Sequence, residues 1–366
     1  MACSDSRPAD GDRAPPESIV VERANAGQPI ITQAMFEQAG VAAEGANING
    51  PSVIRVPDWI PAERRTDPSA VYYLYFADHE GAYIRLAWAA EIAGPWSLHG
   101  SGAAVPVGAR GVLDLGPNLA IPLANGLAIV DHIASPDVHV DDDGQRIVLY
   151  FHGWTEHEGL RPTDQKTLVA TSSDGLDFSG RIEPVTLGRS YFRVFGYQEA
   201  LYAFANRGDA YRARDASLPW APTAGFDFAT DLWELREPNP WDAALQTAGV
   251  NEMLRHVTVT LRGDVLHVLY TRIGGAPEQI LHSTVDLAAQ DFASWQPTFP
   301  AELVLAPELA WEGGDIAPTP SVGGPAPEDV CQLRDPYLFQ DADGQSFLFY
   351  AGRGEDAIGV AEVSWR

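Results

Sequence analysis

Histidine and arginine side chains recur at matching places along this sequence. The histidines are His79, His132, His152 and His256, and the arginines are Arg193, Arg255, Arg272 and Arg334. An imidazole titrates near neutral pH and can move a proton during a reaction. A guanidinium holds carboxylates and other anions through paired hydrogen bonds. The set therefore predicts acid–base chemistry beside an anion-binding group, with core histidines and ordinary ion pairs as the alternative reading of each residue.

Three carboxylates are the candidate acids and bases of this chemistry: Asp335, Asp137 and Glu252. One carboxyl group can protonate a leaving oxygen while another activates a water molecule, so a pair of them can cleave a bond by hydrolysis. We expect Asp335 or Asp137 to be the base and Glu252 to be the acid. Asp335 is alternatively a turn residue before a proline, and Asp137 alternatively caps a turn or pairs with an arginine.

Five copies of one strand pattern position these residues. In each copy a short first strand precedes a second strand rich in aromatic and β-branched residues, as strands prefer. The first strands are expected at Pro51–Val56, Pro136–Val140, Tyr191–Tyr197, His256–Leu261 and Pro336–Gln340. The second strands are expected at Tyr72–Ala77, Ile147–Gly153, Ala200–Asn206, Val265–Arg272 and Ser346–Gly352. This repetition predicts an all-β chain, a single five-bladed β-propeller with four-stranded antiparallel blades.

The fifth copy ends at Arg366 without an outer strand. Ser18–Glu22 (SIVVE) can supply that strand, so we expect the N-terminal strand to close the ring. Residues 1–17 are then a polar tail and residues 18–366 form the propeller. Short helices are expected within Ile31–Gly40 and Trp233–Leu254, and a pair of β-sandwiches is the alternative fold.

The starts of the first strands and the loops after the second strands meet at one mouth of such a propeller. The predicted catalytic residues at this mouth are Asp335, Asp137, Glu252, His256 and His132. The predicted substrate-binding residues are His79, His152, Trp154, Tyr191, Arg193, Arg255, Arg272, Arg334 and Glu355. Among them, Trp154 is either a stacking platform for a sugar ring or a plain rim aromatic.

Composition and charge exclude several partners and functions. A net charge of -26 opposes binding to nucleic acid, and no apolar stretch is long enough to span a membrane. Cys3, within a polar Ser, Asp, Pro and Arg tail, resembles the start of a mature bacterial lipoprotein. We therefore expect a lipid anchor at Cys3 and a periplasmic or cell-surface location, with a cytoplasmic protein as the alternative.

Two acidic runs, Asp141–Gly144 and Asp341–Gly344, look like calcium loops. Each lies between a first and a second strand, where a tight acidic turn is expected, so no metal ligand is assigned to them. We expect no required cofactor, with a central divalent cation such as calcium as the alternative.

Residues 45–366 resemble the five-bladed propeller superfamily of glycosidases that includes glycoside hydrolase family 43. The run Leu333–Phe339 (LRDPYLF) looks like that group's repeated Asp-Pro-hydrophobic first strand, with diverged copies at Asn49–Ile54 and Ser135–Val138. The resemblance implies an aspartate base, a second aspartate that tunes the acid, and a glutamate acid. The chain departs from that set, because Gly50 and Ser135 stand where two of the aspartates would be; only Asp335 matches its motif position.

Three functions follow from these features. The first is a glycoside hydrolase acting on plant, algal or microbial oligosaccharides, some of them uronate-bearing, in which His256 and Arg255 grip the sugar. The second is a uronate lyase, in which arginine neutralises the carboxylate and His132, His152 or Tyr191 abstracts the α-proton. The third is a glycan-binding lipoprotein without catalysis.

Overall fold

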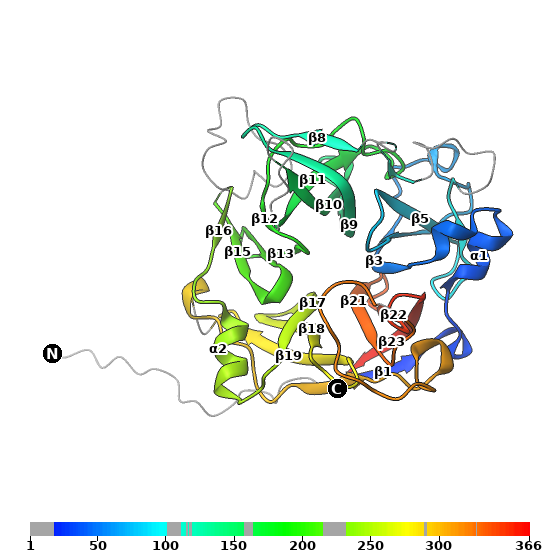
Figure 1. The fold of residues 1–366 in the computed structure, drawn as a ribbon. Coiled ribbons are helices and arrows are strands. Elements are labelled where there is room, and N and C mark those ends of the chain that lie inside the picture. The colour runs from blue at the N-terminus through cyan, green and yellow to red at the C-terminus, as the bar shows by residue number, and fades with distance from the viewer. Residues whose placement is uncertain are drawn as a thin grey trace.

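The chain folds as a ring of five antiparallel sheets around a central axis (Figure 1). The structure, a computed structural model, describes residues 18–100, 111–114, 116, 119–156, 164–214, 232–288, 291–326 and 328–366. Each sheet has four or five strands within these ranges. The predicted all-β, five-bladed propeller is therefore confirmed, and the alternative of paired sandwiches is wrong.

The strands of each blade are given from the axis outward. Blade 1 contains β3 (Asn49–Arg55), β4 (Tyr72–Ala77), β5 (Tyr83–Ala89) and β6 (Ser97–Leu98), with β7 (Leu113–Asp114) also on β5. Blade 2 contains β9 (Ala128–Asp141), β10 (Arg146–Glu156), β11 (Gln165–Ser172) and β12 (Gly188–Arg189), with β8 (Ala120–Pro122) on β9. Blade 3 contains β13 (Arg193–Tyr197), β14 (Ala200–Phe204), β15 (Ala210–Ala213) and β16 (Trp233–Leu235).

The last two blades follow the same order. Blade 4 contains β17 (Met253–Arg262), β18 (Val265–Ile273), β19 (Ile280–Asp286) and β20 (Glu302–Leu305). Blade 5 contains β21 (Leu333–Gln340), β22 (Ser346–Gly352), β23 (Ala357–Trp365) and β1 (Ile19–Arg23), with β2 (Ile31–Thr32) also on β23. The second strands in blades 1 and 5 match their predicted bounds. The outer strand of blade 5 comes from the N-terminal segment, with Ile19 opposite Trp365 and Arg23 opposite Ala361.

The hydrophobic core is divided into clusters that lie between neighbouring blades. In β4, for example, Tyr73 and Tyr75 pack toward blade 2, whereas Leu74 and Phe76 pack toward blade 5. A strand that is buried on both faces needs apolar residues at every position rather than at alternate ones. This requirement explains the uninterrupted aromatic run of the second strands, which identified the repeat in the sequence.

The two α-helices lie at the periphery of the ring (Figure 1). Helix α1 (Gln33–Gln38) falls within the first predicted helical segment, and α2 (Pro240–Thr247) falls within the second. In the described part of the chain, no helix is long and apolar enough to cross a membrane. The predicted lipid anchor at Cys3 lies outside the described residues, so it stays a prediction.

A circle of hydrogen bonds ties each innermost strand to the next blade, and we call it the inter-blade ring. Its three acceptors are Ser52 Oγ, Asp137 Oδ2 and Thr258 Oγ1, which receive the backbone N–H groups of Val138 (2.9 Å), Val194 (2.8 Å) and Leu338 (2.8 Å). Its two donors are Arg193 Nε and Tyr337 Oη, which reach the carbonyl oxygens of Val257 (3.1 Å) and Val53 (3.3 Å). Every blade junction thus carries one such link at the axis.

Candidate functional site

The backbone changes conformation two residues before each member of the inter-blade ring. The residues at these five positions, which we call the mouth positions, are Gly50, Ser135, Tyr191, His256 and Asp335. Four of them have positive φ, between 48° and 66°. In four blades, the pairing register of the innermost strand also shifts around this point. A bulge with a left-handed residue re-aims a side chain away from the regular alternation of a strand.

A cavity of about 470 Å³ opens at the mouth positions. Its described lining residues are His79, Glu80, Asp131, His132, Trp154, Gln165, Tyr191, Asn206, Arg255, His256, Ile273, Gly324 and Pro325. Six of these belong to the set predicted from sequence, and they come from blades 1 to 4. The fold therefore brings His79, His132, Trp154, Tyr191, Arg255 and His256 together, as the repeat predicted.

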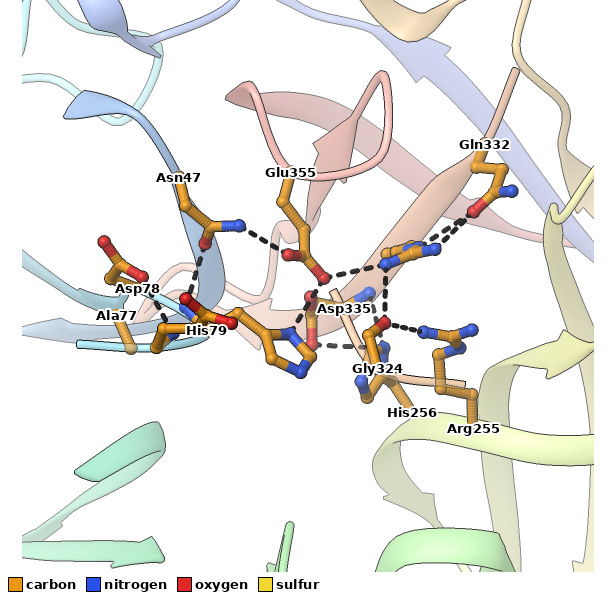
Figure 2. Close-up of polar contacts among 12 residues, drawn as sticks. Asn47, Ala77, Asp78, His79, Arg255, His256, Gly324, Gln332, Asp335 and Glu355 are labelled. Atoms are coloured by element: carbon orange, nitrogen blue, oxygen red, sulfur yellow. Dashed lines mark hydrogen bonds and ion pairs between the residues drawn. The ribbon is translucent and has the colours of Figure 1, made fainter. Parts of the chain in front are cut away.

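Asp335 is buried beside His256, which lines this cavity (Figure 2). Its Oδ1 is 3.1 Å from Nδ1 of His256, and its backbone N–H donates to the same nitrogen at 3.3 Å. Burial, together with the negative charge of Glu355, raises the pKa of Asp335 from 3.8 to about 7. Burial also lowers the pKa of His256 well below its ordinary value. The pair therefore changes charge near neutral pH, with Asp335 as the group that titrates.

Glu355 forms a second carboxylate–imidazole pair, with His79 (Figure 2). Its oxygens accept hydrogen bonds from Asn47 Nδ2 (2.6 Å) and Arg334 Nη1 (2.9 Å), and Oε1 is 3.1 Å from His79 Nδ1. Burial alone would raise the pKa of Glu355, but these partners lower it to about 2. Burial likewise opposes the charge on His79, yet the bond to Glu355 raises the pKa of His79. The pKa shifts thus favour the uncharged forms of Asp335 and His256 but the charged forms of Glu355 and His79.

A buried guanidinium cluster holds Glu355 in place. Arg334 is fully buried and donates to Gln332 Oε1 from Nε and Nη2, at 2.9 and 2.6 Å. Glu278, also fully buried, lies 3.1 Å from Nε of Arg255 and 3.7 Å from Nε of Arg334. Both arginines donate to the carbonyl oxygen of Gly324, so the segment that carries Gly324 is held against the cavity wall.

Aromatic rings form the floor between blades 2 and 4. The ring centroids of His132 and His152 are 5.5 Å apart, those of His152 and Tyr191 are 4.5 Å apart, and those of Tyr191 and His256 are 4.8 Å apart. Burial lowers the pKa of His132 to about 4 and that of His152 well below its ordinary value. Both imidazoles are therefore neutral at neutral pH, and His132, which lines the cavity, offers a ring rather than a charge to a ligand.

Eight of the fourteen predicted site residues do not line the cavity: Asp335, His152, Arg334 and Glu355 are next to residues that do, and four others have partners elsewhere. Asp137 and Arg193 belong to the inter-blade ring, and Asp137 also contacts His139 Nε2 at 2.9 Å. These contacts, above all the one with His139, outweigh burial and hold the pKa of Asp137 below its usual value. Glu252 pairs with Arg272 at 2.8 Å beside a separate cavity of about 130 Å³. The expected meeting of Asp137 or Glu252 with Asp335 in one cavity is therefore not what the fold produces.

Several residues of the site had no sequence signal or only a weak one. Asn47 and Gln332 hold the ends of the network and belong to no recognisable motif. Glu278 follows a second strand, which places it near the mouth but says nothing of its burial. Among the described residues, no three His, Cys, Asp or Glu side chains are arranged to hold a metal ion.

Solved structures that share this fold include glycosidases. An α-L-arabinofuranosidase from Lactobacillus brevis aligns with 13% identity and a TM-score of 0.51, over 94% of each chain. A thermostable family-43 glycoside hydrolase aligns with 11% identity and a TM-score of 0.51, over 87% of this chain and 88% of the other. At these identities the likeness establishes the fold, and it agrees with the resemblance found in the sequence.

A curated relative is much closer in sequence. No protein-family model matches the chain. "Uncharacterized protein R118" of Acanthamoeba polyphaga mimivirus is 30% identical over 327 residues, which cover 87% of this chain and 83% of the viral protein. This identity over most of both sequences shows that the chain belongs to the same family as the mimivirus protein.

Proposed function

We propose that the chain is a glycoside hydrolase that cleaves oligosaccharides in the mouth cavity. One observation carries the proposal: two carboxyl–imidazole pairs reach this cavity, and their environments shift their proton affinities in opposite directions. Enzymes obtain an acid and a base by placing titratable groups in environments that shift their pKa values apart. The arabinofuranosidase and the family-43 hydrolase that share this fold support a glycosidic bond as the target.

His79 is the acid in this proposal. Its Nδ1 is bonded to Glu355, which leaves Nε2 for the leaving-group oxygen. The raised pKa of His79 favours the protonated imidazolium near neutral pH. The proton passes from Nε2 to the glycosidic oxygen as the bond between that oxygen and the anomeric carbon breaks.

The pair of His256 and Asp335 is the base. In this structure Nδ1 of His256 accepts the backbone N–H of Asp335. Ionised Asp335 favours the other tautomer, in which Nδ1–H donates to its Oδ1, and Nε2 is then free to accept a proton from the attacking water molecule. Above pH 7 the Asp335 carboxylate is ionised, and the pair can take one proton from that water as its oxygen bonds to the anomeric carbon. The number of protons balances, because His79 gives one and the pair takes one.

The test is hydrolysis of a panel of nitrophenyl glycosides and neutral or uronate-bearing oligosaccharides. Asp335→Asn should lower kcat/KM at least about 100-fold, the usual size of a lost general base. The matched control is Asp143→Asn, which makes the same change in an exposed turn. The acid limb of the pH–rate profile should lie near pH 7. Absence of hydrolysis by the folded protein, or full activity of Asp335→Asn, would contradict the proposal.

A lyase is the second candidate, because one observation favours it. Arg255 lines the cavity together with Tyr191 and neutral His256. A guanidinium on a uronate carboxylate acidifies the neighbouring C–H, and a neutral imidazole can remove that proton while the glycosidic oxygen leaves. An unsaturated product with no heavy oxygen taken from isotopically labelled water would identify a lyase, whereas incorporated heavy oxygen would identify a hydrolase.

A further inference from the structure

A second cavity of about 540 Å³ adjoins the mouth cavity. The two share three wall residues: Trp154, Gln165 and Asn206. The other described residues of the second cavity are Asp164, Arg189, Ser190 and Arg207. A ligand that fills the mouth cavity can therefore extend past Trp154, whose indole offers a flat apolar face to a sugar ring.

The described charged side chains in and around this second cavity leave a surplus of one positive charge. Its one described carboxylate, Asp164, is neutralised by Lys166 at 2.6 Å. Arg189 pairs with Asp209, and no described carboxylate contacts the exposed side chain of Arg207. Most of the surface of a chain with a net charge of -26 repels anions, so a local surplus of guanidinium favours an anionic ligand at this cavity.

The position of Arg207 is fixed by its surroundings. Arg207 has φ of +63°, a left-handed conformation that is unfavourable for a residue with a side chain. Its carbonyl oxygen accepts a hydrogen bond from Asn239 Nδ2 at 2.9 Å, and Asn239 also donates to Asp209 at 2.8 Å. The preceding Asn206 N–H donates to the carbonyl oxygen of Ser190 at 2.8 Å. Contacts on both sides thus hold this turn at the cavity rim.

We propose that the second cavity is a subsite for an anionic sugar residue, with Arg207 and Arg189 binding its carboxylate or sulfate ester. The proposal rests on the proposed function, because the mouth cavity must hold the adjoining sugar. Guanidinium groups bind both oxyanions through paired hydrogen bonds. The substrate class is therefore an acidic oligosaccharide of at least two residues, carrying its charge one residue away from the cleaved bond.

The test compares binding of three probes by isothermal titration calorimetry: xylotriose, trigalacturonate and a sulfated carrageenan tetrasaccharide. An Asp335→Asn background prevents turnover. Arg207→Gln should weaken binding of the preferred acidic probe about tenfold, as expected for loss of a charged hydrogen bond, and change xylotriose binding less than twofold. Arg207→Lys should restore part of the loss. Added salt should weaken acidic-probe binding in the parent more than in Arg207→Gln.

The matched control is Arg64→Gln, because Arg64 is also exposed but pairs with Asp174 in a hairpin turn at the far end of β11. It removes the same charge and should bind like the parent. A preference for trigalacturonate assigns a carboxylate, and a preference for the tetrasaccharide assigns a sulfate. Binding of neither acidic probe, or equal binding by Arg207→Gln, overturns the subsite. An acidic probe that binds through Arg207 but is not hydrolysed by the native chain refutes the hydrolase instead.

Discussion

Asp335 should make the protein less stable as the pH rises through neutrality. Burial raises the pKa of this carboxyl from 3.8 to about 7, so the folded state binds the proton more tightly than the unfolded state. The stabilisation is full below pH 3.8 and is lost as the pH rises through 7. From about pH 5 to about pH 8, this one group should cost roughly 3 kcal/mol of unfolding free energy.

Asp335→Asn isolates that effect, because the amide has nearly the same shape but does not titrate. Urea unfolding followed by tryptophan fluorescence at several pH values gives the free energy of unfolding of both proteins. Other groups, including Glu355 and His79, titrate in both and cancel in the difference to a first approximation. Relative to the native chain, the variant should gain roughly 3 kcal/mol between these pH values.

The control for this experiment is again Asp143→Asn, which should follow the native protein at every pH. If Asp335→Asn and the native chain lose equal stability over this range, Asp335 titrates normally. Asp335 would then be ionised at all pH values in this range, and its assignment to the proposed base would lose its support.

Three further predictions concern the same region. Glu355→Gln removes the charge that raises the pKa of His79, so the His79 resonances should titrate at lower pH in nuclear magnetic resonance spectra; an unchanged titration would refute the pairing. Ser52→Ala leaves the buried Val138 N–H without its acceptor and should cost about 1 to 3 kcal/mol in urea unfolding, with no loss meaning that water replaces the hydroxyl. Gly50→Ala should cost about 1 to 2 kcal/mol, because φ is +61° there and the added carbon would lie 3.3 Å from the next blade; unaltered stability would show that the backbone relaxes.

The sequence was sufficient to predict the blades because each second strand is buried on both faces. Its aromatic and β-branched run repeats along the chain, and a repeat of this size has few architectures that leave no long open edge. The placing of His79, His132 and His256 in one cavity followed directly from that geometry. Predicting this cluster of histidines required only the order of the strands within a blade.

The outcome for Asp137 and Glu252 depended on details that a repeat does not contain. Asp137 lies two residues beyond a mouth position, and the bulge there turns Ser135 rather than Asp137 out of the regular strand. Glu252 is drawn to Arg272, a partner on the next strand. A bulge or a local ion pair can change where a single side chain points. The spacing of a strand pattern predicts where a strand lies but not the direction of each side chain near its end.

The inter-blade ring also governs how molecules can enter and leave. Its members Ser52, Asp137, Arg193 and Thr258 are buried, and their side chains occupy the axis below the mouth. Among the described residues, these side chains close the axis beneath the mouth, so a ligand that enters the mouth cavity meets them as a floor. A glycan bound by the proposed enzyme would therefore lie in or across the mouth rather than pass along the axis of the ring, and its product would leave on the same face.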